Sequence, residues 1–194
     1  MSFRPAIVIP LAVALAGCGI NSIPTAEETA KARWADVQND YQRRADLIPN
    51  LVATVRAAGA QEKDILTQVT QARASATQVK VSGDDLTNPA KVAAYERAQN
   101  AVSLNLQRLQ EAYPELQSQK NYGTLMSQLE GTENRIAIAR RDYNGAVQNY
   151  NTTIRTFPAA VGARIFYGAK PMTPFAATTP GAETAPTVNF GNAS

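Results

Sequence analysis

Histidine is absent from this chain of 194 residues, and cysteine and tryptophan each occur once. Without histidine, the chain has no Ser-His-Asp or Cys-His catalytic arrangement and no histidine-bearing zinc motif. A single cysteine also excludes an intrachain disulfide. No glycine pattern matches a phosphate-binding loop or a dinucleotide-binding fingerprint. We therefore predict no enzyme, no catalytic residue, no cofactor and no metal ligand.

Charged residues are few, at 18% of the chain, and the net charge is only +3. Basic and acidic residues are interspersed, so the sequence lacks the concentrated positive patch that is typical of nucleic-acid binding. Ordinary solubility explains the mild basicity better than contact with anionic lipid does. Apolar residues make up 44%, which indicates a folded domain.

A long apolar run is also missing. The N-terminal run, residues 5–16, is too short for a hydrocarbon core of about 30 Å and contains Pro10. It follows a single basic residue and ends in Leu15-Ala16-Gly17-Cys18, which resembles the lipobox of bacterial lipoproteins. This resemblance implies that residues 1–17 are a cleaved signal peptide and that Cys18 is lipidated. The alternative is an uncleaved signal anchor, in which Cys18 is incidental.

The residue after this cysteine bears on the location. Lipoproteins that are retained in an inner membrane usually have Asp there, whereas this chain has Gly19. The expectation is a protein of the cell envelope that is anchored to a membrane through Cys18 and faces the periplasm. The outer membrane is favoured if the host has two membranes. Residues 18–26 are predicted to form a tether.

A seven-residue repeat predicts the last helix, from residue 122 to residue 157. Such a repeat places one apolar stripe along a helix and favours a left-handed supercoil with partner helices. Pro158 follows the repeat directly and predicts the end of the helix. The members of the repeat are Tyr122, Leu129, Ile136, Tyr143, Tyr150 and Phe157.

Three earlier helices are expected. The capping-box spacing of Thr25 and Glu28 predicts the start of the first, and its stripe passes a kink at Pro49 to a stop at Gly59. The second covers residues 61–80. The third begins at Asn88-Pro89 and ends near Ala112. The stripe of the first helix consists of Trp34, Tyr41, Ile48 and Val55.

These patterns predict an all-α fold, an elongated antiparallel, coiled-coil-like four-helix bundle over residues 27–166. Residues 167–194 are expected to be a flexible tail. Apolar residues between positions 159 and 175 are expected to pack only loosely on the end of the bundle. Residues 176–194 are rich in Thr, Pro, Ala and Gly with one charge, Glu183, a composition typical of disorder.

One polar residue interrupts the apolar stripe of the first helix. Arg44 lies between Tyr41 and Ile48 where an apolar residue is expected, and a buried guanidinium needs a partner. We predict that it pairs with Glu133 or Glu130 of the last helix and sets the register of the two helices. The alternative is that Pro49 rotates the stripe and Arg44 faces water. The two glutamates could instead hold a cation, but such residues more often pair with Lys or Arg.

Two strings resemble a known family. The first is Tyr41-Gln42-Arg43-Arg44-Ala45-Asp46-Leu47-Ile48-Pro49-Asn50-Leu51-Val52, and the second is Leu129-Glu130-Gly131-Thr132-Glu133-Asn134-Arg135-Ile136. With Tyr113-Pro114-Glu115-Leu116 and Phe157-Pro158, they are similar to the LemA family of bacterial envelope proteins over about residues 34–166. The resemblance implies an antiparallel helical bundle held at a membrane by an N-terminal segment. It supplies no catalytic or ligand-binding residues, and the cysteine at position 18 departs from the many members that have no lipobox.

Two functions follow as hypotheses. The first is a membrane-anchored structural or protein-interaction module that self-associates as a homo-oligomer, because a long helical rod offers surface to other helices. The alternative is an accessory subunit of an envelope signalling or stress-response system, which would need a defined protein partner. No sequence feature identifies that partner.

Overall fold

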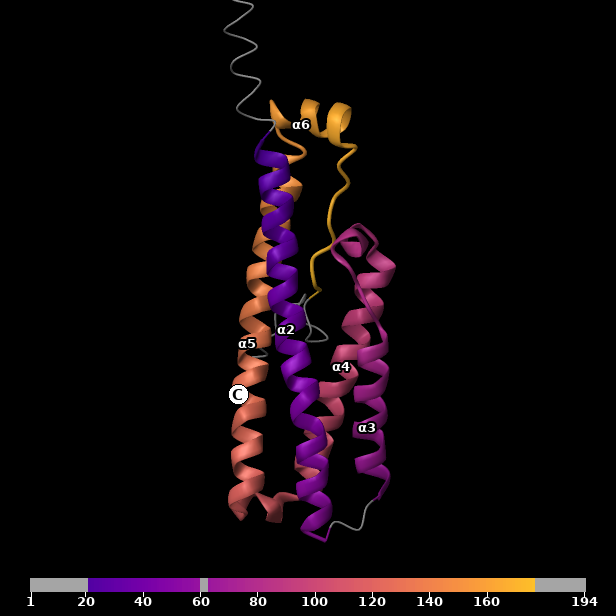
Figure 1. The fold of residues 1–194 in the computed structure, drawn as a ribbon, viewed down its shortest axis with the longest axis vertical. Helices are drawn as coiled ribbons and strands as arrows, with labels where there is room; N and C mark the ends of the chain where they lie inside the picture. The colour runs from indigo at the N-terminus through magenta and orange to yellow at the C-terminus, as the bar shows by residue number, and fades with distance from the viewer. Residues whose placement is uncertain (1–20, 60–62, 177–194) are drawn as a thin grey trace, which may run out of the picture.

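The structure is a computed structural model that describes residues 21–59 and 63–176. All regular structure in these two ranges is helical, as the sequence predicted. The four long helices alternate in direction along the bundle (Figure 1). The elements are α2 (Ser22–Ala57), α3 (Lys63–Gln78), η1 (Gly83–Thr87), α4 (Pro89–Ala112), η2 (Pro114–Ser118), α5 (Lys120–Thr153), α6 (Ala159–Gly162) and η3 (Ala163–Tyr167).

The four helices differ greatly in length, and this difference shapes the bundle. Helices α2 and α5 have 36 and 34 residues, whereas α3 and α4 have 16 and 24. At about 1.5 Å per residue, the longer pair makes a rod of roughly 50 Å. Helix α2 packs mainly on α5, and α3 packs mainly on α4. Four helices therefore surround the core at one end, while only α2 and α5 continue to the other end (Figure 1).

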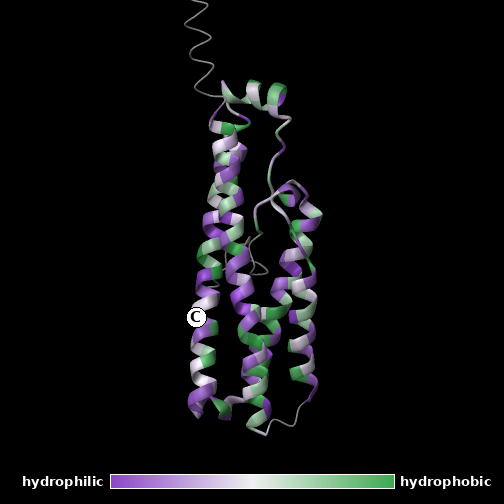
Figure 2. Cartoon of the chain, in the orientation of Figure 1, coloured by the Kyte–Doolittle hydropathy of each residue, from purple (hydrophilic) through white to green (hydrophobic). Residues whose placement is uncertain are grey.

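The predicted apolar stripes form the core. Every predicted stripe residue of α2 is buried, and so are the first five members of the α5 repeat. Apolar and polar residues alternate around each helix in the way that one-sided burial requires (Figure 2). Helix α2 continues through Pro49, and Gly59 beyond its end has a φ of 86°, a conformation that glycine adopts without strain. The side chain of Asn88 caps α4 by accepting from the backbone N–H groups of Ala90 and Lys91.

Helix α2 begins earlier than the capping box predicted. It starts at Ser22, so residues 22–26 of the predicted tether are helical. The Thr25 hydroxyl donates to the carbonyl oxygen of Asn21 at 2.9 Å instead of capping a helix that starts after it. Ile23 is fully buried, and burial of an apolar side chain outweighs a local capping preference.

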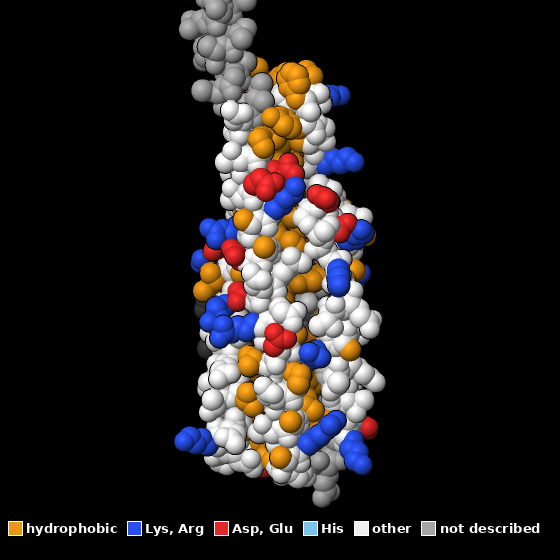
Figure 3. Space-filling model, in the orientation of Figure 1, with side chains coloured by type: hydrophobic (Ala, Val, Ile, Leu, Met, Phe, Trp, Pro, Cys, Tyr) orange, Lys and Arg blue, Asp and Glu red, His pale blue; other side chains and the backbone are white. Residues whose placement is uncertain are grey.

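The other end of the α2–α5 pair also differs from prediction. Helix α5 ends at Thr153, and Phe157, the last member of the predicted repeat, is 85% exposed. The residue before a proline is disfavoured in helical conformation, which explains why the repeat stops short of Pro158. Elements α6 and η3 then lie across this end of the bundle, where hydrophobic side chains are exposed (Figures 1 and 3).

The prediction of a flexible tail from residue 167 is wrong for residues 167–176. After η3, Gly168 adopts a left-handed φ of 54°, and the chain runs back between the long and short helices (Figure 1). Met172 and Phe175 are each 4% exposed, so this segment is part of the core and not a loose cover on the bundle end. It fills space that the short helices α3 and α4 leave open. Residues 177–194 lie outside the described ranges.

Candidate functional site

The first candidate site is a polar cluster around Arg44. Its guanidinium is buried at 1% exposure and donates from Nη1 to Glu133 Oε1 at 2.8 Å and to Ser103 Oγ at 2.6 Å. From Nη2 it donates to the backbone carbonyl and the side-chain oxygen of Gln99, at 2.9 and 2.7 Å. One arginine of α2 therefore binds two residues of α4 and one of α5. The fork geometry of the guanidinium makes this possible.

The structure places Arg44 against one of the two predicted glutamates, Glu133. Glu133 contacts Arg44, but its side chain remains 40% exposed. Glu130 is exposed and has no contact with Arg44, although both glutamates line a groove of about 450 Å³ between α4 and α5. The two glutamates are three positions apart and so point about 60° apart around the helix. Arg44 is buried, so the alternative in which Pro49 turns it toward water is wrong. In the two described ranges, no three of the Cys, Asp and Glu side chains gather as a metal site would require.

The Arg44 cluster adjoins a groove of about 410 Å³ between α2, α3 and α4. Tyr41 forms part of its wall, and the Arg44 guanidinium lies 5.0 Å from the centre of the Tyr41 ring. Arg73 reaches in from α3 and donates to the carbonyl oxygen of Ala45 at 2.6 Å. Arg44 and Arg73 therefore both have partners within the chain at this groove.

The second candidate site is the channel that holds residues 169–176. Asn144 and Asn151 of α5 each pair with the backbone of one residue in this segment. Asn144 accepts from the Phe175 N–H at 2.8 Å and donates to the Phe175 carbonyl at 3.1 Å, and Asn151 makes the same two bonds to Met172, both at 2.8 Å. Each asparagine side chain thus supplies the backbone of this segment with one donor and one acceptor, as a neighbouring β-strand would.

Further contacts fix this segment between the helices. Thr173 donates its N–H to the carbonyl of Leu86 at 2.8 Å and accepts from the Tyr143 hydroxyl at 2.9 Å. Burial raises the pKa of the Tyr143 hydroxyl, so this group remains a donor at neutral and mildly basic pH. Arg140 of α5 donates to Glu96 of α4 at 2.6 Å and to the Ala176 carbonyl at 3.0 Å.

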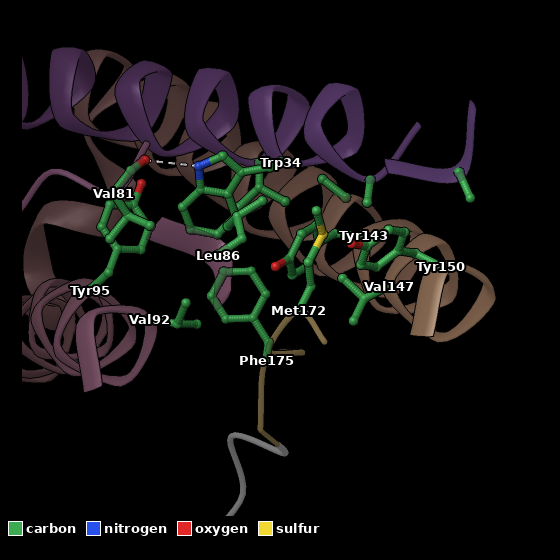
Figure 4. Packing of buried hydrophobic residues seen from close by; sticks show 14 of the residues in the cluster. Trp34, Val81, Leu86, Val92, Tyr95, Tyr143, Val147, Tyr150, Met172 and Phe175 are labelled. Carbon is green, nitrogen blue, oxygen red and sulfur yellow. Dashed lines mark hydrogen bonds between the residues drawn. The ribbon is translucent and has the colours of Figure 1, made fainter. Parts of the chain in front are cut away.

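Aromatic packing connects this segment to the longest helix. The ring of Phe175 stacks on Trp34 with centroids 5.5 Å apart, and Tyr95 and Tyr143 contact the same indole at 5.2 and 5.3 Å (Figure 4). The indole N–H of Trp34 donates to the Val81 carbonyl at 3.0 Å. The Arg140 guanidinium lies 4.6 Å from the centre of the Phe175 ring, a favourable cation–π distance. Phe175 is therefore an anchor residue of the core.

We expect Asn144→Ala to reduce the free energy of unfolding by about 1–3 kcal/mol, because the half-buried N–H and carbonyl of Phe175 would each lose a partner. Urea unfolding followed by circular dichroism measures the change. Asn149→Ala is a matched control, since its side chain lies exposed on the same helix. Equal losses in the two variants would contradict a specific role for the asparagine pairing.

The sequence interpretation overlooked several residues of these two sites. Gln99, Ser103, Glu96 and Asn144 have no signature by themselves, because polar residues on amphipathic helices usually face water. One signal was present in the printed sequence. A Tyr-Asn pair occurs twice with a spacing of seven, at Tyr143-Asn144 and Tyr150-Asn151, which places both asparagines on one side of α5.

Cys18, the predicted lipidation site, lies outside the described residues. Within the described ranges, no helix combines the length and the hydrophobicity that are needed to cross a membrane.

Comparison with known proteins identifies one family and a few distant relatives. A model described as "LemA family" matches residues 33–190. Magnetosome proteins MamQ 1 and MamQ 2 of Paramagnetospirillum magneticum are each similar to the chain at 28% identity over 158 residues. Magnetosome protein MamQ of Magnetospirillum gryphiswaldense is 27% identical over 158 residues. Each match covers 71% of this chain and 58% of the relative, so the chain spans less than two thirds of their length.

Proposed function

We propose that this chain, which belongs to the LemA family, is a membrane-anchored lipoprotein of the cell envelope. We further propose that it acts as a structural or protein-interaction module. The observation that supports this most directly is the start of α2. Only Gly19, Ile20 and Asn21 separate Cys18 from the helix that begins at Ser22. A lipid on Cys18 would therefore hold a rigid rod of roughly 50 Å close to the membrane surface.

The polar clusters support a mechanical role better than a chemical one. Arg44 and Arg140 are both satisfied by partners within the chain, and they connect α2, α4, α5 and the C-terminal segment. A catalytic group, by contrast, needs a free face toward a substrate. We therefore assign these clusters to the stiffness and register of the rod, and the outer helix faces to contacts with other proteins.

Self-association is the form of interaction that we favour, because each rod offers long helical faces to a second copy. We place the protein on the periplasmic side of a membrane, with the outer membrane favoured by Gly19 if the host has two. Light scattering of the detergent-solubilised full chain should give a mass of two or more copies. A single-copy mass, together with one protein recovered by crosslinking in membranes, would favour the alternative of an accessory subunit in an envelope signalling system.

Cys18→Ser should abolish lipid attachment, because the thiol is the group that accepts the lipid. The expected result is a larger, unprocessed precursor without acyl mass, whereas the wild-type chain begins at residue 18 and has the mass of its acyl chains. Two or more acyl chains give stable anchoring, which one chain does not. Intact-mass analysis of membrane-extracted protein measures both species.

Gly17→Ala provides a control for this test, since it keeps a small residue before the cysteine and should still be processed. A wild-type protein that is cleaved at another residue and has no acyl mass would exclude the lipoprotein assignment.

A further inference from the structure

Exposed large hydrophobic residues concentrate at one end of the rod. Five side chains in the short stretch from residue 157 to residue 167 are 45–85% exposed, while only Leu104 and Ile138 are comparably exposed elsewhere in the described ranges. Scattered exposed apolar residues are normal, but a contiguous group of them indicates an interaction surface. The five residues are Phe157, Val161, Ile165, Phe166 and Tyr167, and we call them the end patch.

The packing of α6 and η3 explains why these side chains face outward. The residues that rest on the bundle are small, since Ala159 and Ala163 are 7% and 2% exposed. The large residues Ile165 and Phe166 of the same two turns are 68% and 69% exposed. A simple end cap would bury the large residues and expose the alanines. This arrangement leaves the large apolar side chains of α6 and η3 exposed.

Basic residues surround the end patch. Arg155, Arg164 and Lys170 are all exposed, and residues 154–176 contain no Asp or Glu. No carboxylate in the described part of the chain forms an ion pair with these three cations. Figure 3 shows hydrophobic side chains at this end with Lys or Arg side chains beside them. Exposed aromatic and aliphatic residues among unpaired cations match the chemistry of an anionic bilayer surface.

The position of the end patch in the fold points to the same partner. Element α6 lies at the end of the rod where α2 begins (Figure 1), and Ser22 is four positions after Cys18. The nearest acidic side chains on α2, Glu27 and Glu28, pair with Lys31 at 2.8 and 3.7 Å, which reduces their repulsion of anionic lipid. An N-terminal membrane anchor would therefore bring the end patch to the bilayer.

We propose that the end patch inserts into the headgroup region of an anionic phospholipid bilayer, with Arg155, Arg164 and Lys170 on lipid phosphates. This inference rests on the proposed membrane anchoring and adds a second contact to it. Two contacts at one end set the direction of the rod, which then projects away from the membrane and not along it. The outer faces of the two long helices, α2 and α5, remain open to protein partners.

Tryptophan fluorescence of the full-length protein in vesicles tests this proposal. Phe166→Trp places a reporter in the end patch, and Leu104→Trp places one at an exposed site on α4 as the matched control. The single native tryptophan, Trp34, is 2% exposed and sets the background. The vesicles contain phosphatidylglycerol and phosphatidylcholine, or phosphatidylcholine alone, with brominated acyl chains as the quencher.

The expected result is a blue shift and at least about twofold stronger quenching for Phe166→Trp than for Leu104→Trp in the anionic vesicles. Loss of phosphatidylglycerol, or Arg164→Gln combined with Lys170→Gln, should reduce this difference. Equal quenching at the two positions, or no vesicle binding at all, would overturn the proposal. A blue shift of Phe166→Trp that depends on protein concentration without vesicles would also overturn it, because it would assign the patch to a second copy of the chain.

The proposal of a lipid anchor and the proposal of an end-patch contact can each be excluded while the other is retained. Wild-type protein without acyl mass that still shows the twofold difference would exclude the lipoprotein assignment and retain the bilayer contact. Acylated protein that binds vesicles but shows no difference between the two reporters would retain the anchor and exclude the end-patch contact. The two measurements therefore test the two proposals independently.

Discussion

Removal of residues 169–194 should lower the free energy of unfolding by at least about 4 kcal/mol, because the core loses Met172 and Phe175, each 4% exposed. Truncation of one buried Phe or Met side chain to alanine typically costs about 2–5 kcal/mol. The deletion also leaves the Asn144 and Asn151 side chains and the Leu86 carbonyl without their partners. Urea unfolding of the truncated and the full chain measures the difference.

Removal of residues 177–194 alone is the matched control for this experiment. It keeps the buried segment, and the new C-terminal carboxylate at Ala176 still offers an acceptor oxygen to Arg140. The composition of residues 177–194 includes too few apolar residues to offset the entropy of ordering, so the change should stay below about 0.5 kcal/mol. If both truncations cost the same, or if Phe175→Ala costs nothing, residues 169–176 are not part of the stable core.

Arg44→Ala should cost about 2–4 kcal/mol of stability. Glu133 is 40% exposed and can be solvated, so the main penalty comes from the side-chain oxygen of Gln99, which loses its donor in a buried site. Arg44→Lys should recover only part of the loss, because one ammonium group cannot reproduce the two-pronged contact to α4 and α5. Chemical denaturation with two independent probes measures each value.

Double-mutant cycles separate the partners of Arg44. Coupling with Glu133 should be about 1 kcal/mol, since the Glu133 side chain is 40% exposed and is partly solvated. Coupling with Gln99 should be larger because that contact is buried. Glu130 serves as the control and should show no coupling. A loss below about 1 kcal/mol for Arg44→Ala, or equal coupling with Glu130 and Glu133, would exclude the idea that this cluster sets the helix register.

The amino-acid sequence predicted the helices and their buried faces well. The stripe from Trp34 to Val55 and the repeat from Tyr122 to Tyr150 are buried as expected, because helix periodicity is a local property that each segment encodes by itself. The anomaly at Arg44 was also visible as a polar residue in an apolar stripe. The sequence indicated Glu133 as one of two candidate partners but did not choose between them, since side chains at the spacing of Glu130 and Glu133 differ by only about 60° around a helix. The partners on α4, Gln99 and Ser103, were not indicated.

The sequence by itself determined the all-α class, the antiparallel bundle, the position of the caps at Asn88 and Gly59, and the need of Arg44 for a polar partner. Only the tertiary structure decided that residues 169–176 fill the space that the shorter helices α3 and α4 leave beside α2 and α5. The physical reason is that burial is a long-range property. Phe175 is held by Trp34, Arg140 and Asn144, and nothing in its own neighbourhood of the sequence indicates that such a site exists.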